Sequence, residues 1–198
     1  MSRWIEPVTL KGQHVTLEPL TPDHEEAIAA AAADGELWKL WYTSVPAPGT
    51  ERAWIDAALA MRDNLGAHPF VVRDATGDIV GSTRFFNVDS ANRRLEIGHT
   101  GYAKRAQRTA INTECKLLLL THAFESLRCI AVEFRTHFLN RQSRAGSERL
   151  GAKLDGILRN HQRARNGTLR DTGVYSITQG EWPTVRAHLT WQLEKPRD

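Results

Sequence analysis

The 198-residue sequence contains only two cysteines, Cys115 and Cys129, and neither stands in a spacing typical of metal ligands. Cys115 falls inside a helical pattern and Cys129 opens a β-like run, so both are expected to be reduced and buried. His99, His122 and His137 are scattered along the chain without ligand spacing. We therefore expect no metal centre, and we expect these histidines to be packed or solvent-facing.

The sequence also lacks a long apolar run. A membrane-spanning helix needs about 20 predominantly apolar residues, and no segment approaches that length. Residues 1–14 show neither the basic nor the apolar region of a secretory signal. The expected protein is cytoplasmic and has no membrane partner. Its 41% hydrophobic and 25% charged residues are typical of a globular chain, and its length favours one domain over residues 1–198.

A large excess of one charge sign is missing as well, because the formal net charge is only +3. The positive residues nevertheless gather in two segments, which contain Lys104, Arg105 and Arg108, and Arg159, Arg163, Arg165 and Arg170. Such clusters attract phosphorylated ligands and nucleic acids alike, or form a solvated face. The second segment has no recognition helix and no interleaved stacking aromatics, so no nucleic-acid partner is expected.

Alternation and capping signals predict the first elements. Residues 14–19 alternate apolar and polar side chains, which predicts a strand, and an alanine-rich helix follows over 24–33. A second helix is expected over about 51–64. The irregular connection between the two helices contains Trp38, Trp41 and Tyr42.

Short β-type runs follow at 69–74, 79–86 and 93–100, separated by turns or polar loops. They predict three antiparallel strands. Residues 109–127 then carry apolar side chains on a stripe that is too broad for a surface helix. This long helix should lie against a sheet.

The last part of the chain contains both predicted strands and predicted helices. Residues 129–136 predict a strand, and 140–150 predict a short helix that Gly151 would end in the left-handed conformation. Asn166-Gly167 predicts a hairpin with a two-residue type I′ turn. A final helix begins at Pro183. The whole order predicts an α/β fold of the α+β type, a mixed sheet with helices on both faces.

Three stretches of the sequence, at 96–125, 139–160 and 170–185, resemble the GNAT acyltransferases in this order. Within them they are similar to the branch of RimJ/RimL-type ribosomal-protein N-acetyltransferases. The resemblance implies a sheet of about seven strands, acetyl-CoA as co-substrate and a primary amine as acceptor, either a protein N-terminus or a small amine. A homodimer would be compatible with it. A non-catalytic acyl-CoA-binding module of the same fold is the alternative.

Members of this family hold the coenzyme A diphosphate where a loop enters a helix, in the pattern Gln/Arg-x-x-Gly-x-Gly/Ala. Unpaired N–H donors and the positive end of the helix dipole favour phosphate there. The matching residues here are 105–110, with Arg108 in place of the first glycine. Arg108 is expected to restrict positive φ while adding a cation. The resemblance implies these coenzyme-binding residues: Ile97, Lys104, Arg105, Gln107, Arg108, Thr109, Ala110, Asn112, Asn140 and Ser143.

In the family, the pantetheine arm lies between two parallel strands that separate at a bulge, which implies residues 94–100 and 129–136 here. Asn140 and Ser143 match the family pattern Asn-x-x-Ser. Ser143 is thereby implied as the general acid that protonates the leaving thiolate, and Asn140 as a helix cap that contacts the pantetheine amides. An ordinary helix cap would produce the same pattern.

The general base stays open at this level. Glu96 lies on the strand beside the expected cleft and could accept the amine proton through water. RimL-like relatives place a glutamate where this sequence has Gln162, which cannot act as a base. His161 has a suitable pKa, but it would point to the opposite face of a regular strand. Glu96, His161 and no dedicated residue are the three alternatives.

The acceptor side is implied only by position. Trp38, Trp41 and Tyr42 stand where this fold builds its acceptor wall, so they are candidate substrate contacts, with plain packing as the alternative. Asp171 is expected to form a surface ion pair with Arg170.

Overall fold

The computed structural model describes residues 4–164 and 166–195. Its strands and helices, in chain order, are β1 (Leu10–Lys11), β2 (Val15–Pro19), α1 (Glu25–Ala33), α2 (Glu51–Leu65), β3 (His68–Asp74), β4 (Ile79–Asp89), β5 (Arg94–Tyr102), α3 (Ala110–Thr121), β6 (Ala131–His137), α4 (Arg141–Arg149), β7 (Lys153–Arg163), β8 (Leu169–Thr178) and α5 (Trp182–Glu194). Among the described residues, no helix combines the length and the apolar character that a membrane crossing requires.

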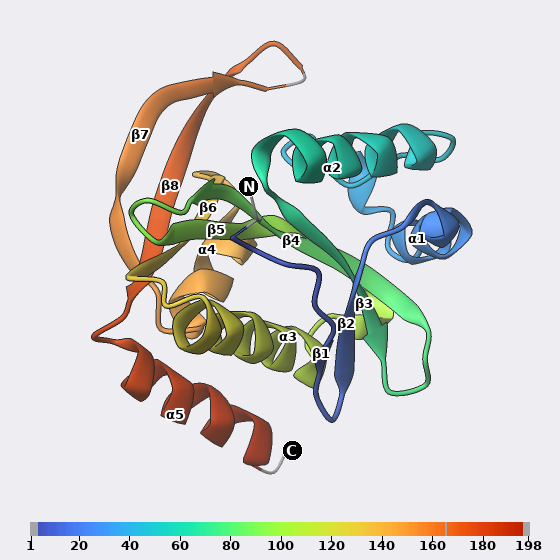
Figure 1. The fold of residues 1–198 in the computed structure, drawn as a ribbon. Coiled ribbons are helices and arrows are strands. Elements are labelled where there is room, and N and C mark those ends of the chain that lie inside the picture. The colour runs from blue at the N-terminus through green and yellow to red at the C-terminus, as the bar shows by residue number, and fades with distance from the viewer. Residues whose placement is uncertain (1–3, 165, 196–198) are drawn as a thin grey trace.

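One eight-stranded sheet in the order β1-β2-β3-β4-β5-β6-β8-β7 runs through the molecule (Figure 1). Neighbouring strands are antiparallel except β5 and β6, which are parallel. The predicted mixed sheet is confirmed. The additional strand is β1, which escapes prediction because two residues are too few to show alternation.

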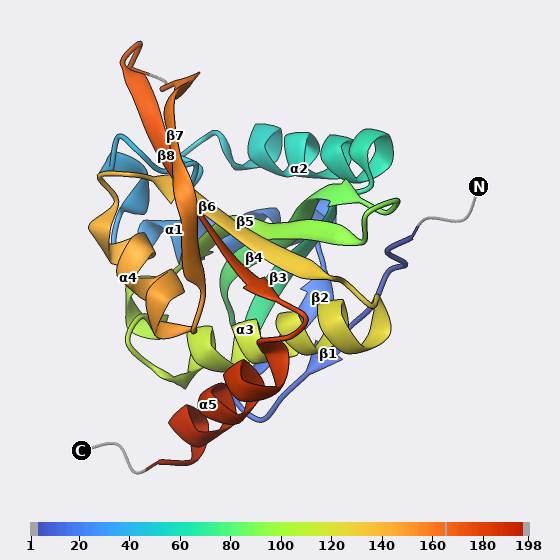
Figure 2. The ribbon, with the colours of Figure 1, turned by 90° about the vertical axis from the view of Figure 1, so that its left-hand side faces the viewer.

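Helices cover both faces of this sheet, as expected. α1 and α2 lie on one face, and α3 and α5 lie on the other (Figure 1). The β7–β8 hairpin extends beyond the body of the sheet, as Figure 2 shows from the side. A small apolar core serves the α1–α2 face and consists of Leu20, Ile28, Ile55, Ala58, Val71 and Ile79.

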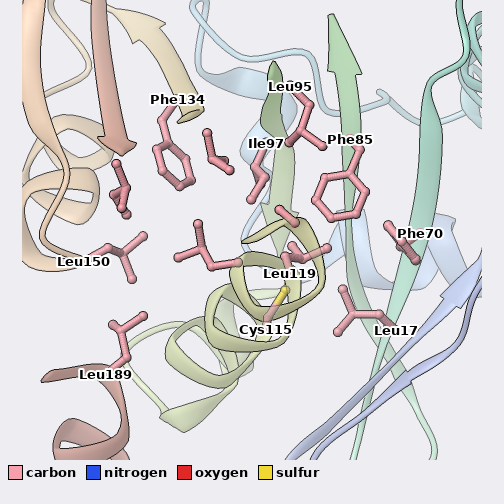
Figure 3. Close-up of a cluster of buried hydrophobic side chains, with 14 of the residues drawn as sticks. Leu17, Phe70, Phe85, Leu95, Ile97, Cys115, Leu119, Phe134, Leu150 and Leu189 are labelled. Carbon is pink, nitrogen blue, oxygen red and sulfur yellow. The ribbon is translucent and has the colours of Figure 1, made fainter. Parts of the chain in front are cut away.

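The larger core lies between the sheet and α3, and the broad apolar stripe of that helix produces it. Cys115 and Leu119 of α3 are 0% exposed and face Phe85 and Ile97 of the strands (Figure 3). Burying a side chain of leucine size stabilises the fold by roughly 1.5–3 kcal/mol. These contacts therefore fix α3 against the sheet. Both cysteines are free and buried, as predicted.

α3 is shorter than the helix predicted over 109–127. It ends at Thr121, and His122–Ser126 form a π-helical turn that is closed by a 3.0 Å hydrogen bond from Leu127 N to His122 O. A π turn is wider than an α turn by one residue. Apolar side chains can still face the core through it, so the hydrophobic pattern does not reveal where the α-helix stops.

The turn of the β7–β8 hairpin also differs from the prediction. Gly167 N donates to Ala164 O, and Ala164 N donates to Thr168 O, so the loop contains the three residues 165–167. The predicted two-residue type I′ turn is wrong, and position 165 lies outside the described residues. Gly167 has a φ of 82°, which suits the left-handed position of a three-residue hairpin loop. Gly151, with a φ of 95°, follows α4 as predicted.

One carboxylate ties α3 to the turn between β1 and β2. Glu114 is 7% exposed and accepts hydrogen bonds from the backbone N–H groups of Gln13, His14 and Val15 at 2.9, 2.6 and 2.8 Å. These three donors replace the water that the carboxylate loses on burial. The bonds therefore connect the middle of α3 to the N-terminal edge of the sheet.

Candidate active site

β5 and β6 separate partway along their length. Arg94–Glu96 of β5 pair with Ala131–Glu133 of β6. Beyond these residues, β5 continues to Tyr102 and β6 to His137, but the two strands no longer pair with each other. A cavity of about 560 Å³ lies beside the unpaired segments. Its wall also includes parts of the α1–α2 connection, α3, α4 and the β7–β8 hairpin.

A bulge in β5 accompanies this separation. Ser82 pairs with Gly101 and Arg84 pairs with Gly98, so Thr83 of β4 faces two residues of β5, His99 and Thr100. His99 has a left-handed φ of 47°. Lining the cavity beneath the bulge, Lys116 of α3 donates from Nζ to Thr100 Oγ1 at 2.9 Å and to Thr83 Oγ1 at 3.4 Å. These two hydrogen bonds let Lys116 support the bulge. Burial lowers the pKa of Lys116.

The N-terminus of α3 opens into the same cavity. Arg108 lines it and has a left-handed φ of 61°, so the arginine keeps the backbone conformation that glycine would adopt. Our expectation that Arg108 restricts positive φ is therefore wrong. Thr109 caps the helix by accepting from Ile111 N at 3.2 Å. Within the described part of the chain, the N–H groups of residues 108–110 have no hydrogen-bond partner, which is the arrangement that binds phosphate.

The other implied coenzyme residues fall into two groups. Ile97, Gln107, Asn112, Asn140 and Ser143 line the cavity, and Gln107 also donates from Nε2 to Tyr102 O at 3.1 Å. Lys104, Arg105, Thr109 and Ala110 do not line it. The Arg105 guanidinium lies 3.5 Å from Asp34 and 3.9 Å from Asp78, while Thr109 and Ala110 border a separate hollow beside His14.

Asn140 and Ser143 begin α4 at the other side of the cavity. Asn140 Oδ1 accepts a hydrogen bond from Ser143 N at 3.0 Å, so the predicted helix cap is confirmed. The Ser143 side chain is exposed and belongs to the cavity wall. Its hydroxyl can therefore reach a group bound in the cavity, which an ordinary cap does not require.

Glu96 lies at the point where β5 and β6 separate. It is 3% exposed, its Oε2 accepts from Asn87 Nδ2 at 2.8 Å, and Arg135 Nε lies 3.6 Å away. Burial raises the pKa of Glu96 to about 7, and the bond from Asn87 and the charge of Arg135 oppose this rise. Arg135 also forms an ion pair with Glu133, so the two glutamates share the positive charge of Arg135. A carboxylate with this pKa is suited to exchange a proton near neutral pH.

His161 and Gln162 both line the cavity, although a regular strand would place them on opposite faces. The register between β7 and β8 shifts between Leu158 and Gln162, and Asn160 has a left-handed φ of 49°. This irregularity brings both side chains to one wall, so our expectation of opposite faces is wrong. His161 Nδ1 lies 3.2 Å from Thr172 Oγ1.

The aromatic connection between α1 and α2 contributes only one of its three candidates to the wall. Tyr42 lines the cavity, whereas Trp41 is 44% exposed and packs edge-on against Tyr42 and His137. Trp38 does not line it.

The expected ion pair of Asp171 with Arg170 is wrong. Asp171 pairs with Arg159 at 2.6 Å, because side chains of adjacent residues in a strand point to opposite faces.

Several charged or titratable residues line the cavity although the sequence did not predict them as site residues. They are His99, Lys116, Arg135, His137 and Arg170. Lys116 carries a usable signal, since it is a cation in an apolar stretch of a helix that should be buried. The histidines carry none, because they reach the cavity through the separation of β5 from β6 and the bulge in β5.

The mixed sheet with helices on both faces, opened between β5 and β6, is the fold of acetyltransferases. A GCN5-related N-acetyltransferase from Brucella melitensis is 30% identical to this chain, with a TM-score of 0.85 over 98% of this chain and 89% of that one. RimJ from Mycobacterium smegmatis, solved in complex with CoA-disulfide, shares the fold at 22% identity, with a TM-score of 0.77 over 94% of this chain and 95% of that one.

Residues 14–153 match the family model of the acetyltransferase (GNAT) domain, and the chain belongs to this family. It is an N-acetyltransferase. YdaF of Bacillus subtilis strain 168, provisionally named a ribosomal N-acetyltransferase, is 28% identical over 176 residues, which are 86% of this chain and 94% of that protein. This similarity supports the RimJ/RimL-like branch.

Proposed function

We propose that the chain, as a single domain over residues 1–198, transfers the acetyl group of acetyl-CoA to a primary amine. The acceptor is the N-terminal α-amine of a protein or a small amine. The observation that carries the proposal is the separation of β5 from β6 beyond Glu96, because Arg108 at the start of α3 and the buried Glu96 line the cavity beside the separated strands. The name of YdaF, a ribosomal N-acetyltransferase, favours an amine of a ribosomal protein as the acceptor.

The residues at the start of α3 fit the diphosphate of acetyl-CoA. The partnerless N–H groups of residues 108–110 would donate to its oxygens, and the Arg108 guanidinium would add a charge-assisted contact. Between the separated strands, backbone groups near Ile97 and the side chain of Asn140 would hold the pantetheine arm. Thr109 and Ala110 would contribute through their backbone N–H groups, whereas those of Lys104 and Arg105 already donate to Asp34 at 2.9 and 3.1 Å and are not free for the coenzyme.

The reaction needs one group to accept a proton and another to supply one. In the proposed mechanism, Glu96 takes a proton from the amine, directly or through water, and the amine nitrogen attacks the acetyl carbonyl carbon. Backbone N–H groups beside the β5 bulge stabilise the resulting oxyanion. The carbon–sulfur bond then breaks, and Ser143 gives its proton to the leaving thiolate. The proton taken up by Glu96 passes to solvent, and a proton from solvent restores the Ser143 hydroxyl.

His161 is the second candidate for the base, because the irregularity in β7 turns it into the cavity. It lies on the hairpin wall, where an incoming amine would pass. Tyr42 would form the facing part of the acceptor wall, and Trp41 would support it by packing edge-on against Tyr42 and His137.

A transfer assay tests the proposal. The purified chain is incubated with acetyl-CoA and a panel of peptides with free N-termini, the same peptides with blocked N-termini, polyamines and aminoglycosides. Free thiol and acetylated product are both quantified. We expect thiol release that is matched by product for at least one free amine. Thiol release at the buffer rate with every free amine would rule the proposal out.

A further inference from the structure

The described part of the cavity wall is rich in cations and poor in carboxylates. Glu96 is the only acidic residue among its described lining residues. Arg108 stands at the helix end that suits the coenzyme diphosphate, and Arg135 is paired with Glu133. Arg170 belongs to neither arrangement, so its charge needs a separate explanation.

Arg170 lies on β8 and is half-buried in the wall. Its Nε donates to Thr172 Oγ1 at 3.0 Å, and no carboxylate lies within ion-pair distance of it in the described part of the chain. The charge of Arg170 lowers the pKa of both His99 and His137, after burial as the larger cause. Arg170 lines the same cavity as these two histidines, which come from β5 and β6.

A second guanidinium adds to this positive field. Arg84 of β4 is 4% exposed, donates to Met61 Sδ at 3.3 Å and lies 5.2 Å from the centre of the Trp54 ring. No described carboxylate pairs with it. Burial lowers its pKa to about 10, so Arg84 stays charged at neutral pH, and its charge also lowers the pKa of His99.

A buried or half-buried arginine without a carboxylate partner is costly unless a ligand supplies the anion. The thioester end of acetyl-CoA carries no charge, so the coenzyme does not supply an anion near His99. Burial lowers the pKa of Arg170 and the carboxylate of Glu96 opposes this, but Glu96 forms no ion pair with Arg170 and lies 3.6 Å from Arg135 instead. The acceptor is therefore the source of an anion that could pair with Arg170. With Nε of Arg170 held by Thr172, its two terminal nitrogens can donate to the two oxygens of a carboxylate.

We infer that the acceptor is a primary amine that carries a carboxylate close to the reacting nitrogen, and that Arg170 binds this carboxylate while Arg84 reinforces the attraction. The inference rests on the proposed acetyl transfer. The carboxylate can belong to a free amino acid or to an acidic residue next to the N-terminus of a peptide. Both sources present the same chemistry to Arg170, and matched acceptors distinguish them.

The test compares acid and amide acceptors that differ in charge alone. Peptides of the form Ser-Asp, Ser-Asn and Ser-Lys followed by a common neutral sequence form one arm, and free serine and serinamide form the other. We expect kcat/KM to be at least about tenfold higher for the acid than for the amide in one arm, as for one charge-assisted hydrogen bond. Arg170→Gln should remove this preference, and Arg170→Glu should favour the Ser-Lys peptide.

Arg163→Gln is the matched control, because Arg163 is an exposed arginine of the neighbouring strand and does not line the cavity. It should keep the preference for the acid. Equal use of acid and amide by the unaltered enzyme, or a preference that survives Arg170→Gln, would overturn the inference while acetyl transfer stands. Absence of transfer to every amine would instead refute the proposed function.

Discussion

At the scale of single residues, Glu96 has opposite effects on stability and on catalysis. In an unfolded chain a glutamate keeps its proton only below about pH 4.3, whereas folded Glu96 keeps it up to about pH 7. The folded state binds more protons between these values, so stability falls as the pH rises through this window, by at most about 4 kcal/mol. The same deprotonation creates the carboxylate that accepts the amine proton.

The substitution Glu96→Gln separates these effects. Because glutamine does not titrate, the variant should be more stable than the unaltered protein at about pH 8.5 and similar to it at about pH 4.5, as thermal unfolding would show. Its kcat/KM should fall by roughly 100-fold, and the rise of activity through about pH 7 should disappear. If that rise persists in Glu96→Gln and disappears in His161→Ala, His161 is the base.

Arg108 gives a prediction with a matched control on the same helical segment. Arg108 precedes α3 with a φ of 61°, and Arg128 follows the π turn at its other end with a φ of 58°, both with exposed side chains. Arg108→Glu should raise the KM for acetyl-CoA by about tenfold or more through repulsion of the diphosphate. Arg128→Glu makes the same change in net charge and should leave this KM unchanged. Equal effects in steady-state kinetics would show that only overall charge matters.

Ser143 should affect turnover more than binding. The thiol of coenzyme A leaves tolerably without help, because the pKa of a free thiol is about 8.5. Ser143→Ala should therefore lower kcat by about tenfold and leave the KM for acetyl-CoA nearly unchanged. The cap through Asn140 Oδ1 uses only the backbone N–H of residue 143, so thermal stability should not change. A rise in KM with unchanged kcat would assign Ser143 to binding.

At the scale of elements, α3 connects the core to the site, and Glu114 anchors it to the β1–β2 turn. Glu114→Gln removes the charge from three short hydrogen bonds and turns one accepting oxygen into a donor. We expect a loss of about 2–4 kcal/mol in the free energy of unfolding by urea, since bonds to a buried charge are strong. The KM for acetyl-CoA of the folded fraction should change little, because Glu114 is outside the cavity wall.

The elements themselves were largely predictable from the sequence, and their irregular parts were not. Alternation and the broad stripe of α3 predict strands and a buried helix, because side-chain periodicity follows burial. The bulge at His99 and Thr100 and the irregularity near Asn160 depend on how neighbouring strands pair, and no local pattern encodes this. These two irregularities bring His99, His161 and Gln162 into the cavity.

At the scale of the whole molecule, charge distribution explains what sequence reasoning could and could not find. The resemblance pointed to the start of α3 and to Ser143, and position on a strand beside the expected cleft pointed to Glu96. The structure brings Arg108, Glu96 and Ser143 to one cavity. The role of Arg170 was not predictable, since an arginine next to Asp171 looks paired in the sequence. Only the fold shows that Asp171 binds Arg159 and leaves Arg170 to the cavity.

Binding of coenzyme A should stabilise the whole domain, because the start of α3, β5, β6 and α4 would all contact one ligand. A ligand at 100 times its dissociation constant adds about 2.7 kcal/mol to the free energy of unfolding. For a chain of this size, that gain corresponds to a rise of roughly 5–10 °C in the melting temperature. Differential scanning fluorimetry with coenzyme A should show this rise for the unaltered protein and for Arg128→Glu, and a much smaller one for Arg108→Glu. An equal rise in all three proteins would place the coenzyme away from the N-terminus of α3, and the cavity between β5 and β6 would then need another ligand.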